Sequence, residues 1–207
     1  MKSVKEKKER ALGERLGIKG DRCSSHKCAL VRRPYRPGMH GNQRGGRRKA
    51  LSDFGRQLKE KQKFKIAYGI SERTLRRIFA LAQRSGASTA DRLVELLERR
   101  LDNVVFRLGF APSRRSAHQL VAHGHILVNG KRVRAGGYVV AKGDVISFHE
   151  SAKRKRFFAE LPNRLRNYTP PEWLALDPKG VSGRVQELPT AVPSPFEVSA
   201  VVESFSK

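Results

Sequence analysis

The chain has 207 residues, 38% of them hydrophobic, which is enough for one modest core or two small ones. Its 44 Lys and Arg residues outnumber its 19 Asp and Glu residues, giving a formal net charge of +25. Such a chain repels itself unless it binds a polyanion, and nucleic acid is the leading candidate. Because no run approaches the ~18 apolar residues of a spanning helix, and no apolar signal-peptide core is present, we expect a cytoplasmic protein with no membrane partner.

The first fifty residues are strongly basic and have little apolar periodicity. Arg, Gly and Pro alternate in RRPYRPGMHGNQRGGRRKA, a composition that cannot bury enough surface to offset the entropy of the chain. We expect an arm that becomes ordered on RNA, with arginines on phosphates and rings stacked on bases. A disordered, solubilising tail is the alternative. The residues expected to contact RNA here are Arg32, Arg33, Tyr35, Arg36, His40, Arg44, Arg47 and Arg48.

Helical patterns begin after residue 51. They predict helices over residues 53–68, 72–85 and 90–109, each preceded by a Ser or Thr that can cap the first turn. The third carries an apolar stripe from Leu93 to Leu108. Lys and Arg occupy the opposite faces, which either contact RNA or are simply solvated. Of these residues we assign to RNA Lys61, Lys63, Lys65, Arg73 and Arg76.

Residues 98–148 combine helix and strand signals. Ser113 can cap a helix over residues 114–124, and Asn129-Gly130 between β-branched runs predicts a type I′ hairpin. Residues 138–140 and 145–148 are predicted as further short strands. The helix start and the hairpin turn both offer polar groups to an RNA backbone. The assigned residues are Arg114, Arg115, His118, Gln119, Asn129, Lys131 and Arg132, although for His118, His123 and His125 packing is an equal alternative.

The segment RLDNVVFRLGFAPSRRSAHQLVAHGHILVNGKRV resembles the RNA-binding module named after ribosomal protein four of the bacterial small subunit. YGISERTLRR, GDRCSSHKCALVRRPYRPGMHG, PEWLALDPKGVSGRV and VVESFSK extend the resemblance to that ribosomal family over nearly the whole chain. The resemblance implies a ribosomal protein that binds 16S ribosomal RNA at a multi-helix junction of the 5′ domain and nucleates subunit assembly. It also implies contacts with neighbouring small-subunit proteins and with mRNA at the entrance channel, and a contribution to translational accuracy.

We therefore predict an α+β protein with a basic extended N-terminal arm, an all-helical lobe, and an inserted α/β RNA-binding module with a small antiparallel sheet. The arm spans residues 1–45 and the module residues 98–165. The helical lobe combines residues 46–97 with residues 168–207, whose acidic end is expected to fold back or to contact a neighbouring protein.

Cys23 and Cys28 look like half of a zinc site that an earlier Cys-x-x-Cys pair completes in the family that the chain resembles. This chain lacks the earlier pair, so we predict no metal and no other cofactor. No catalytic motif or small-molecule site is evident, and we predict a protein that is not an enzyme. An RNA-modifying enzyme is a distant alternative, because only about 40 residues follow the module. A DNA-binding helix-turn-helix protein is another, although the hairpin and the basic arm argue against it.

Overall fold

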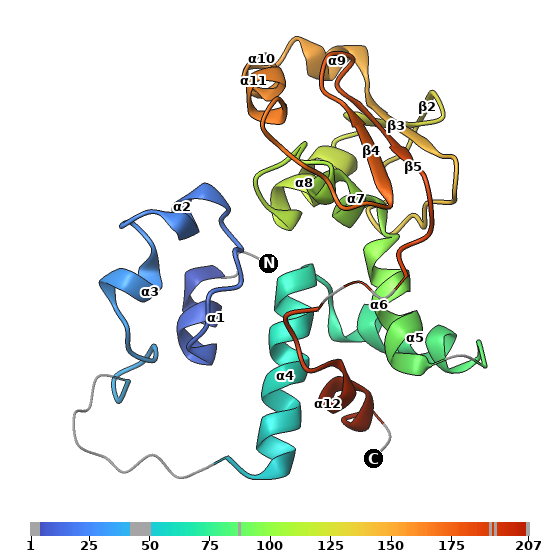
Figure 1. The fold of residues 1–207 in the computed structure, drawn as a ribbon. Helices are drawn as coiled ribbons and strands as arrows, with labels where there is room; N and C mark the ends of the chain where they lie inside the picture. Colours follow the sequence, from blue (N-terminus) through green and yellow to red (C-terminus); the bar gives the residue numbers. More distant parts are fainter. Residues whose placement is uncertain (1–4, 42–50, 87, 191, 193, 206–207) are drawn as a thin grey trace. The chain divides into compact units, whose positions relative to one another are not determined.

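The fold is α+β, as the sequence predicted, and the described residues form helices of 4 to 16 residues and a five-stranded antiparallel sheet (Figure 1). The computed structural model describes residues 5–41, 51–86, 88–190, 192 and 194–205. The chain divides into two compact units, residues 1–90 with 193–207, and residues 91–192. None of the described helices is long and apolar enough to cross a membrane.

The first unit is helical. Its helices are α1 (Lys5–Leu12), α2 (Asp21–Ser24), α3 (Ala29–Arg32), α4 (Asp53–Tyr68), α5 (Glu72–Gln83) and α12 (Val198–Glu203). The predicted caps of α4 and α5 are confirmed, since the hydroxyls of Ser52 and Ser71 each accept the N–H of the residue three positions later, at 3.2 Å. Gly69 ends α4 in the left-handed region with φ 67°.

The C-terminal helix closes the core of this unit. Phe64 of α4 is fully buried, and Phe196 meets its ring edge-on at a centroid distance of 5.8 Å. Phe205 stacks on Phe79 of α5 at 4.7 Å. Residues 194–205 therefore bury aromatic surface that α4 and α5 leave uncovered, which stabilises the unit.

The N-terminal arm contains the three short helices α1, α2 and α3, which the sequence analysis did not predict. Glu9 of α1 is buried, and its carboxylate accepts the backbone N–H groups of Leu16 at 2.9 Å and Ile18 at 3.3 Å, in the loop between α1 and α2. The thiol of Cys23 lies 4.0 Å from both oxygens of the same carboxylate. A polar cluster of this kind has no apolar periodicity, so pattern reasoning could not detect it.

The second unit places helices against the sheet. Helix α6 (Thr89–Glu98) leads into it from the boundary between the units. Its other helices are α7 (Leu101–Arg107), α8 (Arg114–Ala122), α9 (Glu150–Lys153), α10 (Arg156–Ala159) and α11 (Leu161–Leu165). Its strands are β1 (Ile126–Val128), β2 (Lys131–Arg132), β3 (Val145–Phe148), β4 (Leu174–Asp177) and β5 (Ser182–Val185), in the order β2-β1-β3-β5-β4.

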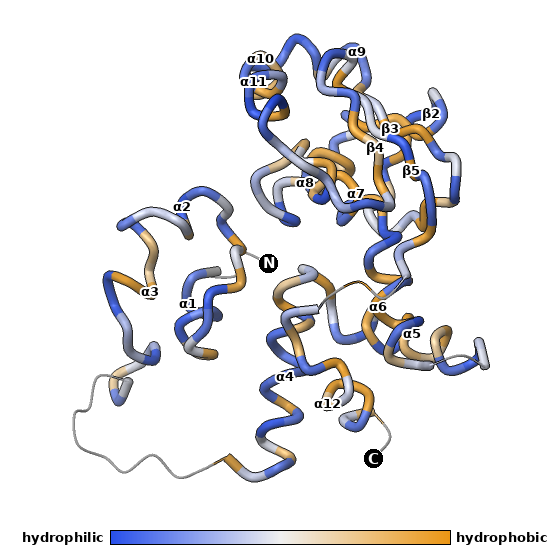
Figure 2. The backbone as a smooth tube through the Cα atoms, in the orientation of Figure 1, coloured by the Kyte–Doolittle hydropathy of each residue, from blue (hydrophilic) through white to orange (hydrophobic). Residues whose placement is uncertain are grey.

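One face of the sheet forms the core with α7 and α8. Along β1 and β3 the buried residues alternate with more exposed ones, as expected for a sheet covered on one side. The core joins Val105 of α7 and Val121 of α8 to Ile146 of β3 and Val185 of β5. Orange stretches in Figure 2 mark the apolar runs of α7, α8 and the sheet. The predicted hairpin is confirmed, with φ 50° at Asn129 and 76° at Gly130.

The helix predicted over residues 90–109 is in fact two helices, α6 and α7, separated by an extended Arg100 with ψ 135°. At the break, the N–H of Leu101 donates to the carbonyl of Tyr138 at 2.8 Å, and that of Asp102 to Gly136 at 3.1 Å. Among the described residues, 138–140 therefore form an isolated bridge between Arg100 and Val139 and not a further strand of the sheet. The apolar stripe continues from α6 into α7, so the spacing of apolar residues gives no sign of the break between the two helices.

Residues 168–192 do not join the helical unit as we expected. Strand β5 pairs with β3, with Val145 opposite Arg184 and Ile146 opposite Gly183, and β4 pairs with β5. A Cβ at Gly183 would lie 2.5 Å from the side chain of Leu108, so this strand approaches α7 too closely for a larger residue. Of the residues 168–207 that we expected in the helical lobe, only 193–207 belong to the first unit.

Candidate nucleic-acid interface

A buried carboxylate supports the start of helix α8. Glu98, at the end of α6, is fully buried and accepts hydrogen bonds from Arg107 Nε at 2.9 Å and Nη2 at 2.8 Å, and from Asn103 Nδ2 at 2.8 Å. Burial raises the pKa of Glu98, but the bonds and charge of Arg107, with Arg114 and Asn103, outweigh burial and lower the pKa overall. The side chain is therefore an anion that holds cations in fixed positions.

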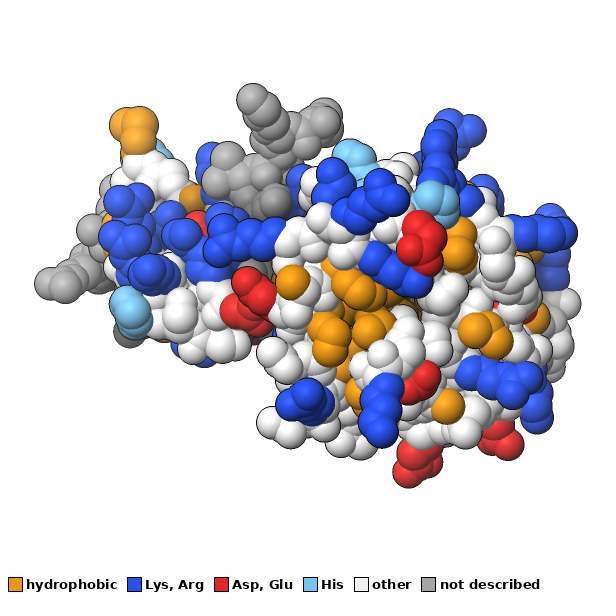
Figure 3. All heavy atoms as spheres, turned by 90° about the horizontal axis from the view of Figure 1, so that it is seen from above, with side chains coloured by type: hydrophobic (Ala, Val, Ile, Leu, Met, Phe, Trp, Pro, Cys, Tyr) orange, Lys and Arg blue, Asp and Glu red, His pale blue; other side chains and the backbone are white. Residues whose placement is uncertain are grey.

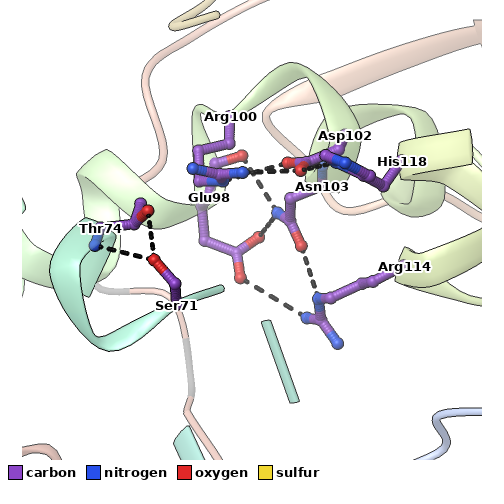
Figure 4. Close-up of polar contacts among 8 residues, drawn as sticks. All are labelled: Ser71, Thr74, Glu98, Arg100, Asp102, Asn103, Arg114 and His118. Carbon is purple, nitrogen blue, oxygen red and sulfur yellow. Dashed lines mark hydrogen bonds and ion pairs between the residues drawn. The ribbon is translucent and has the colours of Figure 1, made fainter. Parts of the chain in front are cut away.

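Arg114 is oriented through this carboxylate (Figure 4). Its Nε donates to Asn103 Oδ1 at 2.7 Å, its Nη2 lies 3.9 Å from Glu98, and its guanidinium lies 4.7 Å from the centre of the Phe106 ring. A guanidinium held in one orientation loses little entropy when it binds a phosphate, and its planar fork matches phosphate oxygens. Arg114 is therefore held in one orientation at the first turn of α8, with its side chain 18% exposed.

A second buried carboxylate orients His118. Asp102 accepts Arg100 Nε at 3.1 Å and Nη2 at 2.7 Å, and its Oδ2 lies 3.0 Å from His118 Nδ1. The His118 side chain is 58% exposed, so the ring is held by Asp102 on one side and is open to solvent on the other. His118 follows Arg114 by four residues and shares its face of α8. Arg115 and Gln119, each the next residue along, are exposed.

The hairpin contributes a second group of side chains. Lys131 and Arg132 are exposed on β2, and Arg132 Nη2 lies 2.7 Å from a ring nitrogen of His149. The amide of Asn129 is used within the fold, since Nδ2 donates to Asp144 at 2.8 Å and Oδ1 accepts the N–H of Val145 at 2.9 Å. Asn129 therefore shapes the turn that presents its basic neighbours.

Two family models match the chain: the ribosomal protein S4/S9 N-terminal domain over residues 1–98, and the S4 domain over residues 99–146. Proteins named small ribosomal subunit protein uS4 are similar along nearly the whole chain. That of Caldicellulosiruptor bescii is 45% identical over 197 residues, 94% of this chain and 93% of the relative. That of Halothermothrix orenii is 44% identical over 197 residues, again 94% of this chain and 93% of the relative. That of Syntrophomonas wolfei is 47% identical over 177 residues, 86% of this chain and 83% of the relative.

The chain belongs to the uS4 family. The two models meet at residues 98 and 99, where the structure breaks α6 from α7. The S4 domain match covers α7, α8 and the hairpin, so the polar network around Glu98 and Asp102 stands where the two matched domains join. The recognition of a ribosomal family from sequence is confirmed.

Candidate residues on α4 and α5 have acidic partners within the uS4 fold. Lys63 is buried and lies 2.6 Å from Glu14. Both Lys61 and Lys65 approach Glu72, at 3.4 and 3.3 Å, and Arg76 lies 3.6 Å from the same residue. Arg73 is exposed. RNA would have to compete with these ion pairs, so this face offers less free charge than its lysine count suggests.

In the arm, the side chains of Arg32, Arg33, Arg36 and His40 are exposed. Tyr35 is half-buried, with the Arg10 guanidinium 4.9 Å from its ring centre. Arg44, Arg47 and Arg48 lie outside the described residues. The face drawn in Figure 3 shows blue Lys and Arg side chains bordering an orange apolar area, with few red acidic groups.

The cysteines of the arm do not fit a structural zinc ion. Both are buried, and burial raises the pKa of the Cys23 thiol, with Glu9 and Cys28 adding to the effect. Glu9 is already engaged by backbone N–H groups. Zinc in such sites takes four nitrogen or sulfur ligands, and no group of three His, Cys, Asp or Glu within the described part of the chain is placed to hold a metal ion.

Sequence reasoning missed the supporting carboxylates. Glu98 and Asp102 contact groups up to 16 residues away, and neither belongs to a motif. The one available signal was their chemistry, because acidic residues on an apolar stripe within a basic segment need cationic partners to be buried.

Proposed function

We propose that this chain is a structural constituent of the small ribosomal subunit and that it binds 16S ribosomal RNA. The observation that carries the proposal is the similarity to proteins named uS4 over 94% of the chain. The pre-organised cations at the start of α8 support it, since RNA helices are recognised largely through phosphates and 2′-hydroxyls. A net charge of +25 supplies the long-range attraction.

The binding site would be a multi-helix junction of the 5′ domain. Helix α8 presents Arg114, Arg115 and His118, and the hairpin presents Lys131 and Arg132. The arm adds a separate group of arginines, and the exposed Arg73 of α5 adds one from the helical unit. Linked contacts of moderate strength give a high overall affinity without a single dominant pocket. A protein that holds several RNA helices together in this way would nucleate assembly of the subunit.

The proposal extends to the assembled ribosome in the cytoplasm. Contacts with neighbouring small-subunit proteins, and with mRNA at the entrance channel, would let the protein contribute to translational accuracy. We propose that it does so without catalysis and without a cofactor. Its structural role then depends on positions and charges alone.

The test is binding of the purified full chain to the 5′ domain of 16S RNA over a series of salt concentrations, with a structured RNA of equal length as competitor. We expect tight binding that survives the competitor and weakens steeply with salt. Equal affinity for both RNAs would reduce the protein to a general RNA-coating role and overturn the proposed specificity.

A further inference from the structure

Three histidines gather where α8 ends, away from Arg114 at its start. His123 caps the C-terminus of α8, His125 precedes β1, and His149 precedes α9. The rings of His123 and His125 stack with centroids 6.1 Å apart and planes inclined by 29°. Phe157 lies on His125 at 6.1 Å. The RNA contacts proposed above do not use His123, His125 or His149.

Cations surround these rings. Arg132 of β2 contacts His149, with Nη2 2.9 Å from Nδ1 and 2.7 Å from Nε2. At Gly124, between His123 and His125, an added Cβ would lie 3.1 Å from both Arg132 Cδ and Arg134 Nε. The positive charge of Lys155, before α10, also lowers the pKa of His125. We call His123, His125, His149, Arg132, Arg134 and Lys155 the histidine cluster.

The surroundings of His125 disfavour the protonated form of its ring. Its Nδ1 is buried and has no hydrogen-bond partner among the described residues. Burial lowers the pKa of His125, and His123, Lys155, Arg132 and His149 lower it further. Glu150, the acidic residue beside His149, is paired with Lys153. The cluster therefore combines concentrated positive charge with a ring that an anion would allow to protonate.

We propose that the histidine cluster binds a backbone phosphate of the RNA and that His125 takes up a proton from solvent when it does so. The inference rests on the proposed function and adds a specific contact to it. A phosphodiester among Arg132, Arg134 and Lys155 reverses the local potential, which favours the charged ring. Helix α8, about 13 Å long at ~1.5 Å per residue, then separates this phosphate from the one at Arg114.

The experiment measures binding of the full chain to the 5′ domain RNA at pH 6 and pH 8 at constant ionic strength. We expect tighter binding at pH 6, by up to about tenfold per pH unit for one linked proton. The variant His125→Gln should lose this dependence. The control variant His26→Gln, which replaces an exposed histidine of the arm, should keep the pH dependence of RNA affinity. The variant His118→Gln measures how much of that pH dependence comes from the histidine at the start of α8.

A second readout does not depend on a variant that might misfold. In the wild-type protein the NMR titration of His125 should move to higher pH when RNA is bound. Tight binding with equal affinity at both pH values, or a His125 titration that RNA leaves in place, would overturn the histidine cluster as a phosphate site. Absence of binding at either pH would instead overturn the proposed function, and the phosphate site with it.

Discussion

At the scale of single residues, the acidic side chains explain how so basic a chain folds. Glu98 and Asp102 are buried and each engages an arginine through two hydrogen bonds. Without them, Arg100, Arg107 and Arg114 would repel one another at the junction of α6, α7 and α8. The two carboxylates thus reduce repulsion and also fix the groups that we assign to RNA.

Replacing Glu98 with Gln should lower the free energy of unfolding by about 3 kcal/mol, because losing one partner of a buried ion pair leaves the others uncompensated. The pKa of Glu98 is lowered on folding from the ordinary value of 4.5, so its stabilisation is present above pH 4.5 and fades as the pH falls through the folded pKa. Urea unfolding at pH 7 and below pH 4 measures both effects, with the exposed Glu172→Gln as control. If the free energies of unfolding of wild type and Glu98→Gln differed equally at the two pH values, the buried Glu98 carboxylate would not be the charged partner of these arginines.

Arg115 and Arg114 should respond differently to truncation. Arg115→Ala removes an exposed side chain, so we expect weaker RNA binding, by about 1–2 kcal/mol, and a salt slope reduced by about one, with unchanged stability. Arg114→Ala should weaken binding and also destabilise the fold, because its bond to Asn103 is lost. Binding isotherms and thermal unfolding separate the two. Lys179→Ala, which removes an exposed charge from the β4–β5 turn, should bind like wild type.

At the scale of elements, the hairpin depends on Asn129. Asn129→Ala should destabilise the second unit by about 2 kcal/mol, through two lost hydrogen bonds and a Cβ residue left in the left-handed region. Gly130→Ala meets no atom within 4 Å and should cost about 1 kcal/mol for its φ alone. Urea unfolding tests both. Because both groups of the Asn129 amide are hydrogen-bonded within the fold, we expect the folded variant to bind RNA with nearly unchanged affinity. A clear loss of RNA affinity would show that Asn129 contacts RNA.

The elements show what the sequence could and could not predict. Helices α4, α5 and α8 were predicted because Ser52, Ser71 and Ser113 cap them through local contacts, and Asn129-Gly130 defines a turn through its own backbone. The place of β5 in the sheet was missed because its pairing with β3 joins residues nearly forty positions apart. The extended Arg100 was missed because carbonyls of residues 136 and 138, not a local signal, satisfy the start of α7.

The site was predictable to the same extent. Arg115, Lys131 and Arg132 were located by charge beside a helix start and a turn, and they are exposed. Lys63 carries the same charge but is buried against Glu14, which no spacing along the chain reveals. Burial and long-range ion pairing, both tertiary properties, therefore decide which cations remain available to RNA.

At the scale of the whole molecule, each unit has a core of its own, and this predicts how fragments behave. The core cluster that runs from Leu101 to Val185 lies within residues 91–192, so a fragment of these residues should unfold cooperatively. It keeps 18 of the 44 Lys and Arg residues. We therefore expect it to bind the 5′ domain RNA with a shallower salt slope and about 10²–10⁴-fold more weakly than the full chain, since the linked contacts of the arm are lost.

The fragment experiment compares urea unfolding and RNA binding of residues 91–192 with those of the full chain, and adds in trans the first unit, made by linking residues 1–90 to residues 193–207. The separate fragment should not restore full affinity, because effective concentration depends on the covalent link. The histidine cluster lies wholly within residues 91–192, so the weaker binding should still tighten from pH 8 to pH 6. A fragment that binds as tightly as the full chain would show that the arm and the helical unit add no contact, and that one unit accounts for RNA recognition.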